Sequence, residues 1–303
     1  MNINQNQFEI LVYVEREGGK KIPQRQMAEG TKLSLGVVNK TLSELVSLGL
    51  VTLDEDREVQ ITKNGLDALE PYRVKRAVVI AAGFGSRMVP ITLNTPKPLV
   101  RVHGKKIIET LLDAVVEAGI PEIVLVRGYL GEQFDVLKTR YPNIRFLENP
   151  MFNESNNISS VLMAKDYLSG AYVMEADLLL ANPRVVRKYE YCSNYLGEYR
   201  EMTDDWCFDV KKGIIRKLNV GGTNCYHMFG ISFWSKEDGK RLAECVEKTW
   251  KMPGGKERYW DEVPLRTFQK EFEVAVRPCE AGDLVEIDTF KELKQIDPVY
   301  AMQ

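Results

Sequence analysis

Short apolar runs alternate with amphipathic segments between about residues 76 and 175, and this alternation predicts strands and helices in turn. Strands are predicted at 77–82, 122–126, 144–148 and 171–175. Helices are predicted between them at 107–118, 131–141 and 159–168. Strands that alternate with helices form a mostly parallel sheet with helices on its faces. We therefore expect an α/β fold of the doubly wound kind.

The pattern changes in the last third of the chain. A hairpin is predicted at 206–220, with its turn at Lys211-Lys212-Gly213. The elements predicted after it are a strand at 226–234, an amphipathic helix at 236–250, a helix at 260–269, a strand at 272–277 and a strand end at 285–289 before the last helix. We expect this inserted part to bind an acceptor molecule.

Residues 1–72 follow a different pattern, which predicts a small domain of helices and paired strands. Apolar positions recur at helical spacing around Phe8 and Leu11, and Ser34 is placed to cap a helix that ends at Gly49. The other predicted elements are a helix at 23–29, strands at 50–53 and 58–61 around a turn at 54–57, and a helix at 63–69. This order resembles the winged helix-turn-helix domains of many bacterial regulators. We therefore predict two domains, at 1–72 and 73–303.

DNA is the partner that this resemblance suggests, but the charge of the small domain gives it weak support. Residues 1–73 contain 9 Lys and Arg against 11 Asp and Glu. The tip of the predicted wing, residues 54–58, is acidic, and the predicted recognition helix offers chiefly Asn39 and Lys40. Affinity for DNA depends on neutralised phosphates. DNA binding and a dimerising, ligand-sensing or vestigial role are both open.

A glycine-rich turn follows the first predicted strand of the larger domain. The turn and the basic residues after it comprise Gly83, Gly85, Ser86, Arg87 and Lys97. Glycines let a backbone bring its N–H groups against an anion, and the basic side chains add positive charge, so the turn suits a triphosphate. A dinucleotide motif needs a third glycine where Met88 stands, and a P-loop motif is absent. On the glycines alone, a purely structural turn is also open.

Composition and charge exclude several classes of protein. The 303 residues carry a net charge of −2, so no overall field attracts nucleic acid or an anionic membrane. No apolar run approaches the roughly 18 residues of a membrane span, and the N-terminus does not resemble a signal peptide, so we expect no membrane association and a cytoplasmic location. Five widely spaced cysteines predict reduced thiols.

Carboxylates are the most promising metal ligands in this sequence. Two histidines are too few for a histidine-rich zinc site, so any metal should be Mg²⁺ bound by carboxylates. Glu175-Ala176-Asp177 comes at the end of a predicted parallel strand, where open α/β sheets bind their ligands. We predict that this acidic pair binds metal.

The spacing A-A-G-x-G-x-R-x-x-P, followed by P-K-P-L, resembles the signature of nucleotidyltransferases that join a nucleoside triphosphate to a phosphorylated small molecule and release pyrophosphate. The resemblance implies a Rossmann-like nucleotidyltransferase fold with a mixed, mostly parallel central sheet. A closer similarity, over about residues 76–298, is to bacterial CTP:phosphocholine cytidylyltransferases. It rests on the segments AAGFGSR, NTPKPLV, GYLGEQF, NNISSVLMA, EADLLL, YWDEV and EIDT.

This resemblance implies roles for individual residues. Catalytic roles are implied for Arg87, Lys97, Asp177 and Asp288, with the two aspartates sharing one Mg²⁺. Nucleotide binding is implied for Ala82, Gly83, Gly85, Ser86, Arg87, Lys97, Gly128, Tyr129, Asn157 and Ser159. From the residues alone, Asp288 could equally cap the final helix, and Asn156-Asn157 could form a turn or a cap.

The acceptor is expected to carry an ammonium group. Aromatic faces and carboxylates bind a quaternary ammonium, and candidates are Trp206, Tyr259, Trp260, Asp261 and Glu286. The family often has an aromatic residue where this chain has Val285. The expected reaction converts CTP and phosphocholine to CDP-choline and pyrophosphate, in a chain that could form a homodimer. Phosphoethanolamine, 2-aminoethylphosphonate or a sugar 1-phosphate as acceptor, and a regulator with a nucleotidyltransferase-like sensor, are the alternatives.

Overall fold

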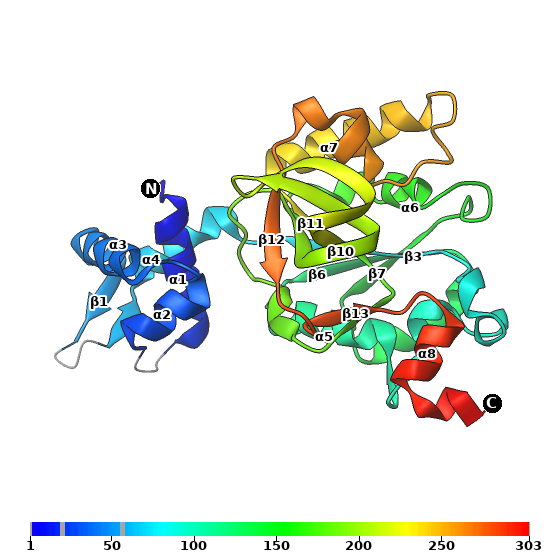
Figure 1. Cartoon of the computed structure of the whole chain (residues 1–303), viewed down its shortest axis with the longest axis horizontal. Coiled ribbons are helices and arrows are strands. Elements are labelled where there is room, and N and C mark those ends of the chain that lie inside the picture. The colour runs from blue at the N-terminus through cyan, green and yellow to red at the C-terminus, as the bar shows by residue number, and fades with distance from the viewer. Residues whose placement is uncertain (1, 19–21, 55–57, 303) are drawn as a thin grey trace. The chain divides into compact units, whose positions relative to one another are not determined.

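The computed structural model describes residues 2–18, 22–54 and 58–302 and consists of two compact units (Figure 1). The first unit comprises the chain up to Arg73 together with Tyr189–Tyr191. The second comprises Val74–Lys188 and the chain from Cys192 onward. Within the described ranges, no helix combines the length and the apolar character that crossing a bilayer requires.

The first unit has the order helix, helix, helix, strand, strand, helix. Its elements are α1 (Gln5–Glu17), α2 (Gln24–Thr31), α3 (Leu35–Ser47), β1 (Val51–Leu53), β2 (Val59–Ile61) and α4 (Lys63–Leu69). The Ser34 hydroxyl accepts a hydrogen bond from the backbone N–H of Val37, so it caps α3 as predicted. β1 and β2 pair antiparallel. Residues 55–57 of the predicted acidic tip lie outside the described residues.

A short segment from later in the chain completes the core of the first unit. Tyr189 is 1% exposed and belongs to the same buried cluster as Phe8 and Leu42. The ring of Tyr191 stacks on that of Tyr72, with centroids 5.3 Å apart. The sequence pattern did not predict this contribution, because the segment lies more than a hundred residues beyond α4 in the chain.

Replacing Tyr189 with Ala is expected to lower the stability of the first unit by about 3 kcal/mol, because a large buried ring is removed from a packed core. The measurement is hydrogen exchange at the amides of α1 and α3, with β3 and β6 of the second unit as the internal reference. Tyr189→Phe keeps the ring and should cost about 1 kcal/mol or less. Unchanged protection of α1 in Tyr189→Ala would show that this ring does not stabilise the unit.

The second unit is built on a seven-stranded sheet in the order β10-β12-β11-β8-β3-β6-β7. The strands are β3 (Arg76–Ala81), β6 (Glu122–Arg127), β7 (Ile144–Glu148), β8 (Ala171–Glu175), β10 (Asn194–Lys211), β11 (Ile214–Trp234) and β12 (Ala275–Cys279). β3 pairs parallel with both β6 and β8, β6 pairs parallel with β7, and β11 runs antiparallel to β8. The expected mixed, mostly parallel central sheet is confirmed.

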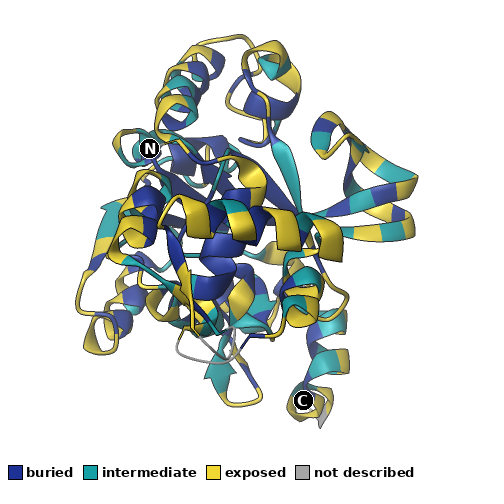
Figure 2. Cartoon of the chain, turned by 90° about the vertical axis from the view of Figure 1, so that its left-hand side faces the viewer, coloured by how far each residue is buried: buried dark blue, intermediate teal, exposed yellow. Residues whose placement is uncertain are grey.

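Helices cover both faces of this sheet (Figure 1). These helices are α5 (Ile107–Glu117) on one face and α6 (Ile158–Met163) and α7 (Lys236–Trp250) on the other. The last helix, α8 (Phe290–Ile296), packs in a separate buried cluster with Met88 and Val100. Two further pairs of short strands are β4 (Arg101–Val102) with β5 (Lys105–Lys106), and β9 (Leu178–Leu180) with β13 (Leu284–Glu286). Helices carry buried and exposed positions on opposite sides (Figure 2), which is the pattern of elements packed on a core.

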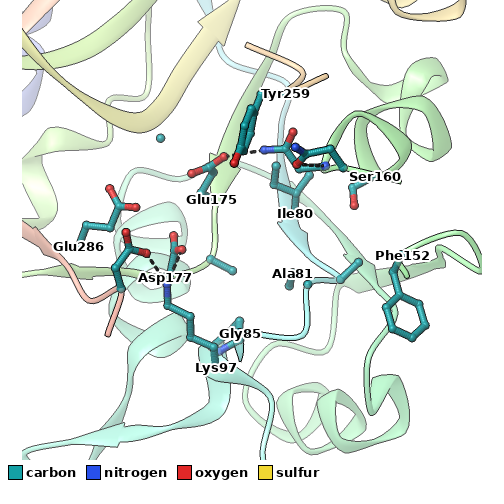
Figure 3. Close-up of a pocket in the computed structure, with 18 of the residues that line it drawn as sticks. Ile80, Ala81, Gly85, Lys97, Phe152, Ser160, Glu175, Asp177, Tyr259 and Glu286 are labelled. Atoms are coloured by element: carbon teal, nitrogen blue, oxygen red, sulfur yellow. Dashed lines mark hydrogen bonds and ion pairs between the residues drawn. The ribbon is translucent and has the colours of Figure 1, made fainter. Parts of the chain in front are cut away.

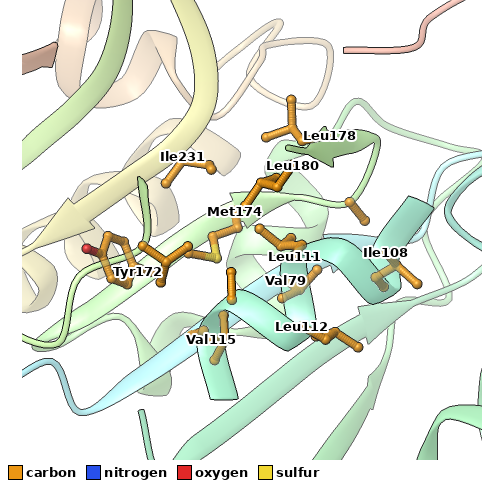
Figure 4. Close-up of a cluster of buried hydrophobic side chains, with 14 of the residues drawn as sticks. Val79, Ile108, Leu111, Leu112, Val115, Tyr172, Met174, Leu178, Leu180 and Ile231 are labelled. Carbon is orange, nitrogen blue, oxygen red and sulfur yellow. The ribbon is translucent and has the colours of Figure 1, made fainter. Parts of the chain in front are cut away.

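The alternation of side chains along β3 separates two apolar layers. Val79 faces α5, where Leu111 and Leu112 join one buried cluster (Figure 4), while Val78 and Ile80 belong to the cluster under α6 and α7. Successive strand residues point to opposite faces, so β3 is apolar throughout and lies at the centre of the sheet. This packing on both faces fixes the carboxyl end of β3, from which the glycine turn continues.

Several predicted elements differ in type or length. The hairpin predicted at 206–220 and the strand at 226–234 are parts of the long β10–β11 pair, whose register shifts between Thr203 and Trp206. Gly221, with φ +72°, lies inside β11, where it accommodates the irregular pairing and does not end the strand. The helix predicted at 131–141 is a 3-10 helix at Gly131–Thr139, and the one predicted at 260–269 is a π-helix at Val263–Thr267.

Candidate active site

A cavity of about 520 Å³ opens at the carboxyl ends of β3 and β8 (Figure 3). Its walls come from the glycine turn after β3, the segment before and within α6, the end of β8, the β10 bulge, the residues on either side of Trp260, and the chain just before α8. Predicted residues that line it are Ala82, Gly83, Gly85, Ser86, Arg87, Lys97, Asn157, Ser159, Asp177, Trp206, Tyr259, Asp261, Glu286 and Asp288.

The glycine turn needs its second glycine for two separate reasons. Gly85 has φ +67°, a conformation that side chains disfavour. A Cβ at this position would also lie 2.9 Å from the Cβ of Lys97. Gly85 therefore lets Lys97 pass directly beneath the turn and reach the centre of the cavity.

Lys97 joins the two aspartates that were predicted to act together. Its Nζ donates to Asp177 Oδ2 at 2.8 Å and to Asp288 Oδ1 at 2.9 Å, and its side chain is only 10% exposed (Figure 3). Burial lowers the pKa of Lys97, but the two carboxylates outweigh this effect and raise the pKa to about 12. Arg87 Nη1 lies 2.9 Å from Asp288 Oδ2. Lys97 is therefore a permanent cation between two distant parts of the chain.

The carboxylates beside Lys97 form an oxygen cluster that fits a divalent cation. Oxygens of Glu175, Asp177 and Glu286 all lie within 4.8 Å of one another. Burial, and then neighbouring negative charge, raises the pKa of Glu175 and of Glu286 well above the usual value. Asp177 Oδ1 is buried and has no hydrogen-bond partner. Hard cations prefer such oxygen ligands, so these residues, together with Asp288, are suited to one.

From the sequence, Asp288 and Asn157 could each cap a helix, and the hydrogen bonds of the structure show that neither side chain does so. The residue that caps α8 is Thr289, whose hydroxyl accepts from the N–H of Glu292, so the carboxylate of Asp288 is directed to Lys97 and Arg87. The side chain of Asn157 does not cap α6. It donates to Glu175 Oε1 at 3.2 Å and accepts from the backbone N–H of Trp260 at 2.9 Å, which links two walls of the cavity.

The wall formed by residues 149–160 carries a buried polar network. Asn149 Nδ2 donates to Ser159 Oγ at 2.9 Å and to Ser160 Oγ at 3.1 Å. Phe152 packs against Gly128, and a Cβ on Gly128 would lie 2.8 Å from the Phe152 ring. Phe152 lies on the side of the cavity away from Glu286 (Figure 3). Asn149, Phe152 and Ser160 also line the cavity but are not among the predicted site residues. Asn149 follows β7 directly, so the strand-end rule could have identified it.

The opposite wall combines aromatic rings with carboxylates. Trp206 and Tyr259 meet edge to face with centroids 5.5 Å apart, and the guanidinium of Arg266 lies 4.9 Å from the centre of the Trp206 ring. Asp261 accepts a short hydrogen bond from the hydroxyl of Tyr195. Burial raises the pKa of Asp261 to about 6, although this hydrogen bond acts in the opposite direction.

Three predicted contact residues do not line the cavity. Trp260 is fully buried and stacks on Tyr195 at 5.9 Å, because its neighbours in the chain face the cavity and it faces the core. Gly128 contacts Phe152 from behind. The hydroxyl of Tyr129 donates to the backbone carbonyls of Thr92 and Leu93, both at 2.9 Å, so this side chain contacts the chain after the glycine turn.

Comparison with known proteins gives consistent matches to the second unit. Residues 77–192 match the MobA-like NTP transferase domain. A 2-aminoethylphosphonate cytidylyltransferase of Lancefieldella rimae is 38% identical over 228 residues, covering 74% of this chain and 92% of that protein. A choline-phosphate cytidylyltransferase of Streptococcus pneumoniae is 31% identical over 229 residues, covering 74% of this chain and 97% of that protein. The solved structure of the CTP:phosphocholine cytidylyltransferase from S. pneumoniae superposes with a TM-score of 0.70 and 31% identity, over 75% of this chain and 99% of that one.

Proposed function

Since the chain belongs to the family of bacterial cytidylyltransferases with a MobA-like NTP transferase domain, we propose that it transfers CMP from CTP to a small acceptor that carries both a phosphonate or phosphate group and a primary ammonium group. The acceptor with the strongest support is 2-aminoethylphosphonate, and pyrophosphate is the second product. Mg²⁺ is the proposed cofactor.

The observation that carries this proposal is the surplus of carboxyl groups in the cavity: burial raises the pKa of Glu175, Asp261 and Glu286, so a cation bound among them would favour their ionised forms. Among the residues that the structure describes, only Arg87 and Lys97 supply positive charge to its walls, against the carboxyl groups of Glu175, Asp177, Asp205, Asp261, Glu286 and Asp288. Among the described residues, the carboxylates of Glu175, Asp205, Asp261 and Glu286 have no ion-pair partner. When an anionic triphosphate binds beside these carboxylates, the negative charges repel one another unless the ligands bring cations with them. A metal ion and an acceptor ammonium meet that need, whereas a sugar 1-phosphate brings no cation.

The same wall favours a primary over a quaternary ammonium. A primary ammonium donates three hydrogen bonds, which suits carboxylates, whereas a quaternary ammonium donates none and relies on aromatic faces. Trp206 already contacts Arg266 and Tyr259, and Trp260 is buried away from the cavity. Phosphocholine is the second candidate, supported by the pairing of Trp206 with Tyr259 and by the choline-phosphate relative.

The proposed mechanism depends on positioning and charge. The backbone N–H groups of the glycine turn would hold the triphosphate, and an acceptor oxygen, already anionic, would attack the α-phosphorus as pyrophosphate leaves. Lys97 cannot act as a base near neutral pH, because its pKa of about 12 keeps it protonated, so its role is to stabilise charge. Asp177 and Asp288 would hold the metal ion, which when bound neutralises phosphate charge.

The test is pyrophosphate release from CTP and Mg²⁺ with a panel of acceptors: 2-aminoethylphosphonate, phosphoethanolamine, phosphocholine and glucose 1-phosphate. We expect kcat/KM for 2-aminoethylphosphonate to exceed that for phosphocholine by about tenfold or more, equivalent to the net value of one charged hydrogen bond. A preference for phosphocholine would overturn the primary-amine assignment. No release above the blank with any amine-bearing acceptor would overturn the proposed reaction.

A further inference from the structure

We propose that Thr92 and Tyr129 are positioning residues that aim the backbone N–H groups of the glycine turn at the nucleotide. Neither side chain contacts the cavity. Thr92 acts on a carbonyl of the turn through its side chain, whereas Tyr129 acts through its backbone N–H and through its contacts with Thr92 and Phe84. This inference rests on the proposed binding of a nucleoside triphosphate at the turn.

The first step concerns the carbonyl of Gly85. It accepts a hydrogen bond from Thr92 Oγ1 at 2.9 Å and another from the N–H of Met88 at 2.9 Å. Thr92 is fully buried, so bulk water does not compete for its hydroxyl. In a planar trans peptide the carbonyl and the following N–H point in opposite directions. Holding the Gly85 carbonyl therefore sets the direction of the N–H of Ser86, a residue that lines the cavity.

The second step concerns the carbonyl of Ala82, at the other end of the turn. It accepts from the backbone N–H of Tyr129 at 3.1 Å. By the same peptide geometry, this bond sets the direction of the N–H of Gly83, which also lines the cavity. The two carbonyls that flank the turn are thus bonded to protein donors, so neither needs to turn its partial negative charge toward a phosphate.

The third step links the two residues. The Tyr129 hydroxyl donates to the Thr92 carbonyl, and its ring meets that of Phe84 in the turn edge to face, with centroids 4.4 Å apart. Gln133 Nε2 donates to the carbonyl of Asn94 at 2.9 Å, which ties down the same stretch. Tyr129 therefore holds Thr92, and Thr92 holds Gly85. The turn is arranged for an anion before the anion binds.

The decisive variant is Thr92→Val, which keeps the shape of the side chain and removes the hydroxyl. We expect its dissociation constant for CTP, measured by calorimetry without acceptor, to rise about tenfold, the value of one buried hydrogen bond together with the loss of orientation. Binding of cytidine, which lacks phosphates, should not change. Thr92→Ser should restore most of the CTP affinity, and Tyr129→Phe should weaken CTP binding about threefold.

The matched control is Thr249→Val, since Thr249 is also fully buried and donates to a backbone carbonyl, that of Cys245, at 2.9 Å. It should lower the melting temperature by a similar amount and leave CTP affinity unchanged. Equal CTP affinity in wild type and Thr92→Val, or an equal loss in Thr249→Val, would overturn the inference. If the wild-type protein itself does not bind CTP, the proposed function fails first, so the two failures are distinguishable.

Discussion

Replacing Lys97 with Met should reduce kcat about 1000-fold with CTP and acceptor at saturation, since a preorganised donor at developing charge contributes two to three orders of magnitude. The Lys97 side chain is 10% exposed and its ammonium already lies between Asp177 and Asp288, so it is in place before any substrate arrives. The dissociation constant for CTP should rise less than kcat falls, because a charge that acts on the reacting phosphorus stabilises the transition state more than the bound substrate.

The measurement is single-turnover formation of the CMP product, which separates the chemical step from binding. Lys106→Met is the matched control, because Lys106 is also partly buried and paired with a carboxylate, Glu109 at 3.0 Å, but does not line the cavity. Lys106→Met should keep kcat within about twofold of wild type. A Lys97→Met enzyme that retains a tenth or more of wild-type kcat would refute the role of this ammonium.

The elements that could be predicted from the sequence are those whose structure depends on residues close together in the chain. The helix at 107–118 is α5, because apolar residues at helical spacing, such as Ile108, Leu111 and Val115, are buried on one side and Gly119 follows its end with φ +70°. The continuously apolar run of β3 indicated a central parallel strand. The glycine turn could be placed because Gly83 and Gly85 directly follow the apolar run of β3 in the sequence, so the turn must lie at the carboxyl end of that strand.

Other features depend on contacts that no local pattern contains. Trp260 and Tyr259 are adjacent aromatic residues, and which of them faces the cavity depends on the packing of Trp260 against Tyr195. Gly221 and Gly222 resemble a turn in the sequence but lie within β11, because the partner strand β10 bulges opposite them. Tyr129 was expected to contact the nucleotide, yet its hydroxyl is bonded to Thr92 and Leu93. In each case a residue distant in sequence decides the outcome.

The second large effect is expected from neutralising Asp177. Asp177→Asn should reduce kcat about 100-fold and raise the Mg²⁺ concentration for half-maximal activity about tenfold or more, because a hard divalent cation loses a charged oxygen ligand. One oxygen of Asp177 lies in the cluster with Glu175 and Glu286, and its Oδ1 has no hydrogen-bond partner. Asp288→Asn should lower kcat by a similar factor and also remove the ion pair that holds Arg87.

Metal binding can be followed independently of turnover by titrating Mn²⁺ into the CTP complex and recording the loss of the free-ion paramagnetic resonance signal. The matched control is Asp113→Asn, a carboxylate paired with Lys105 and Arg140 outside the cavity, which should leave the Mn²⁺ titration unchanged. If Asp177→Asn binds Mn²⁺ as tightly as wild type, Asp177 is not a metal ligand. Because the titration contains no acceptor, it measures metal binding separately from binding of the acceptor ammonium.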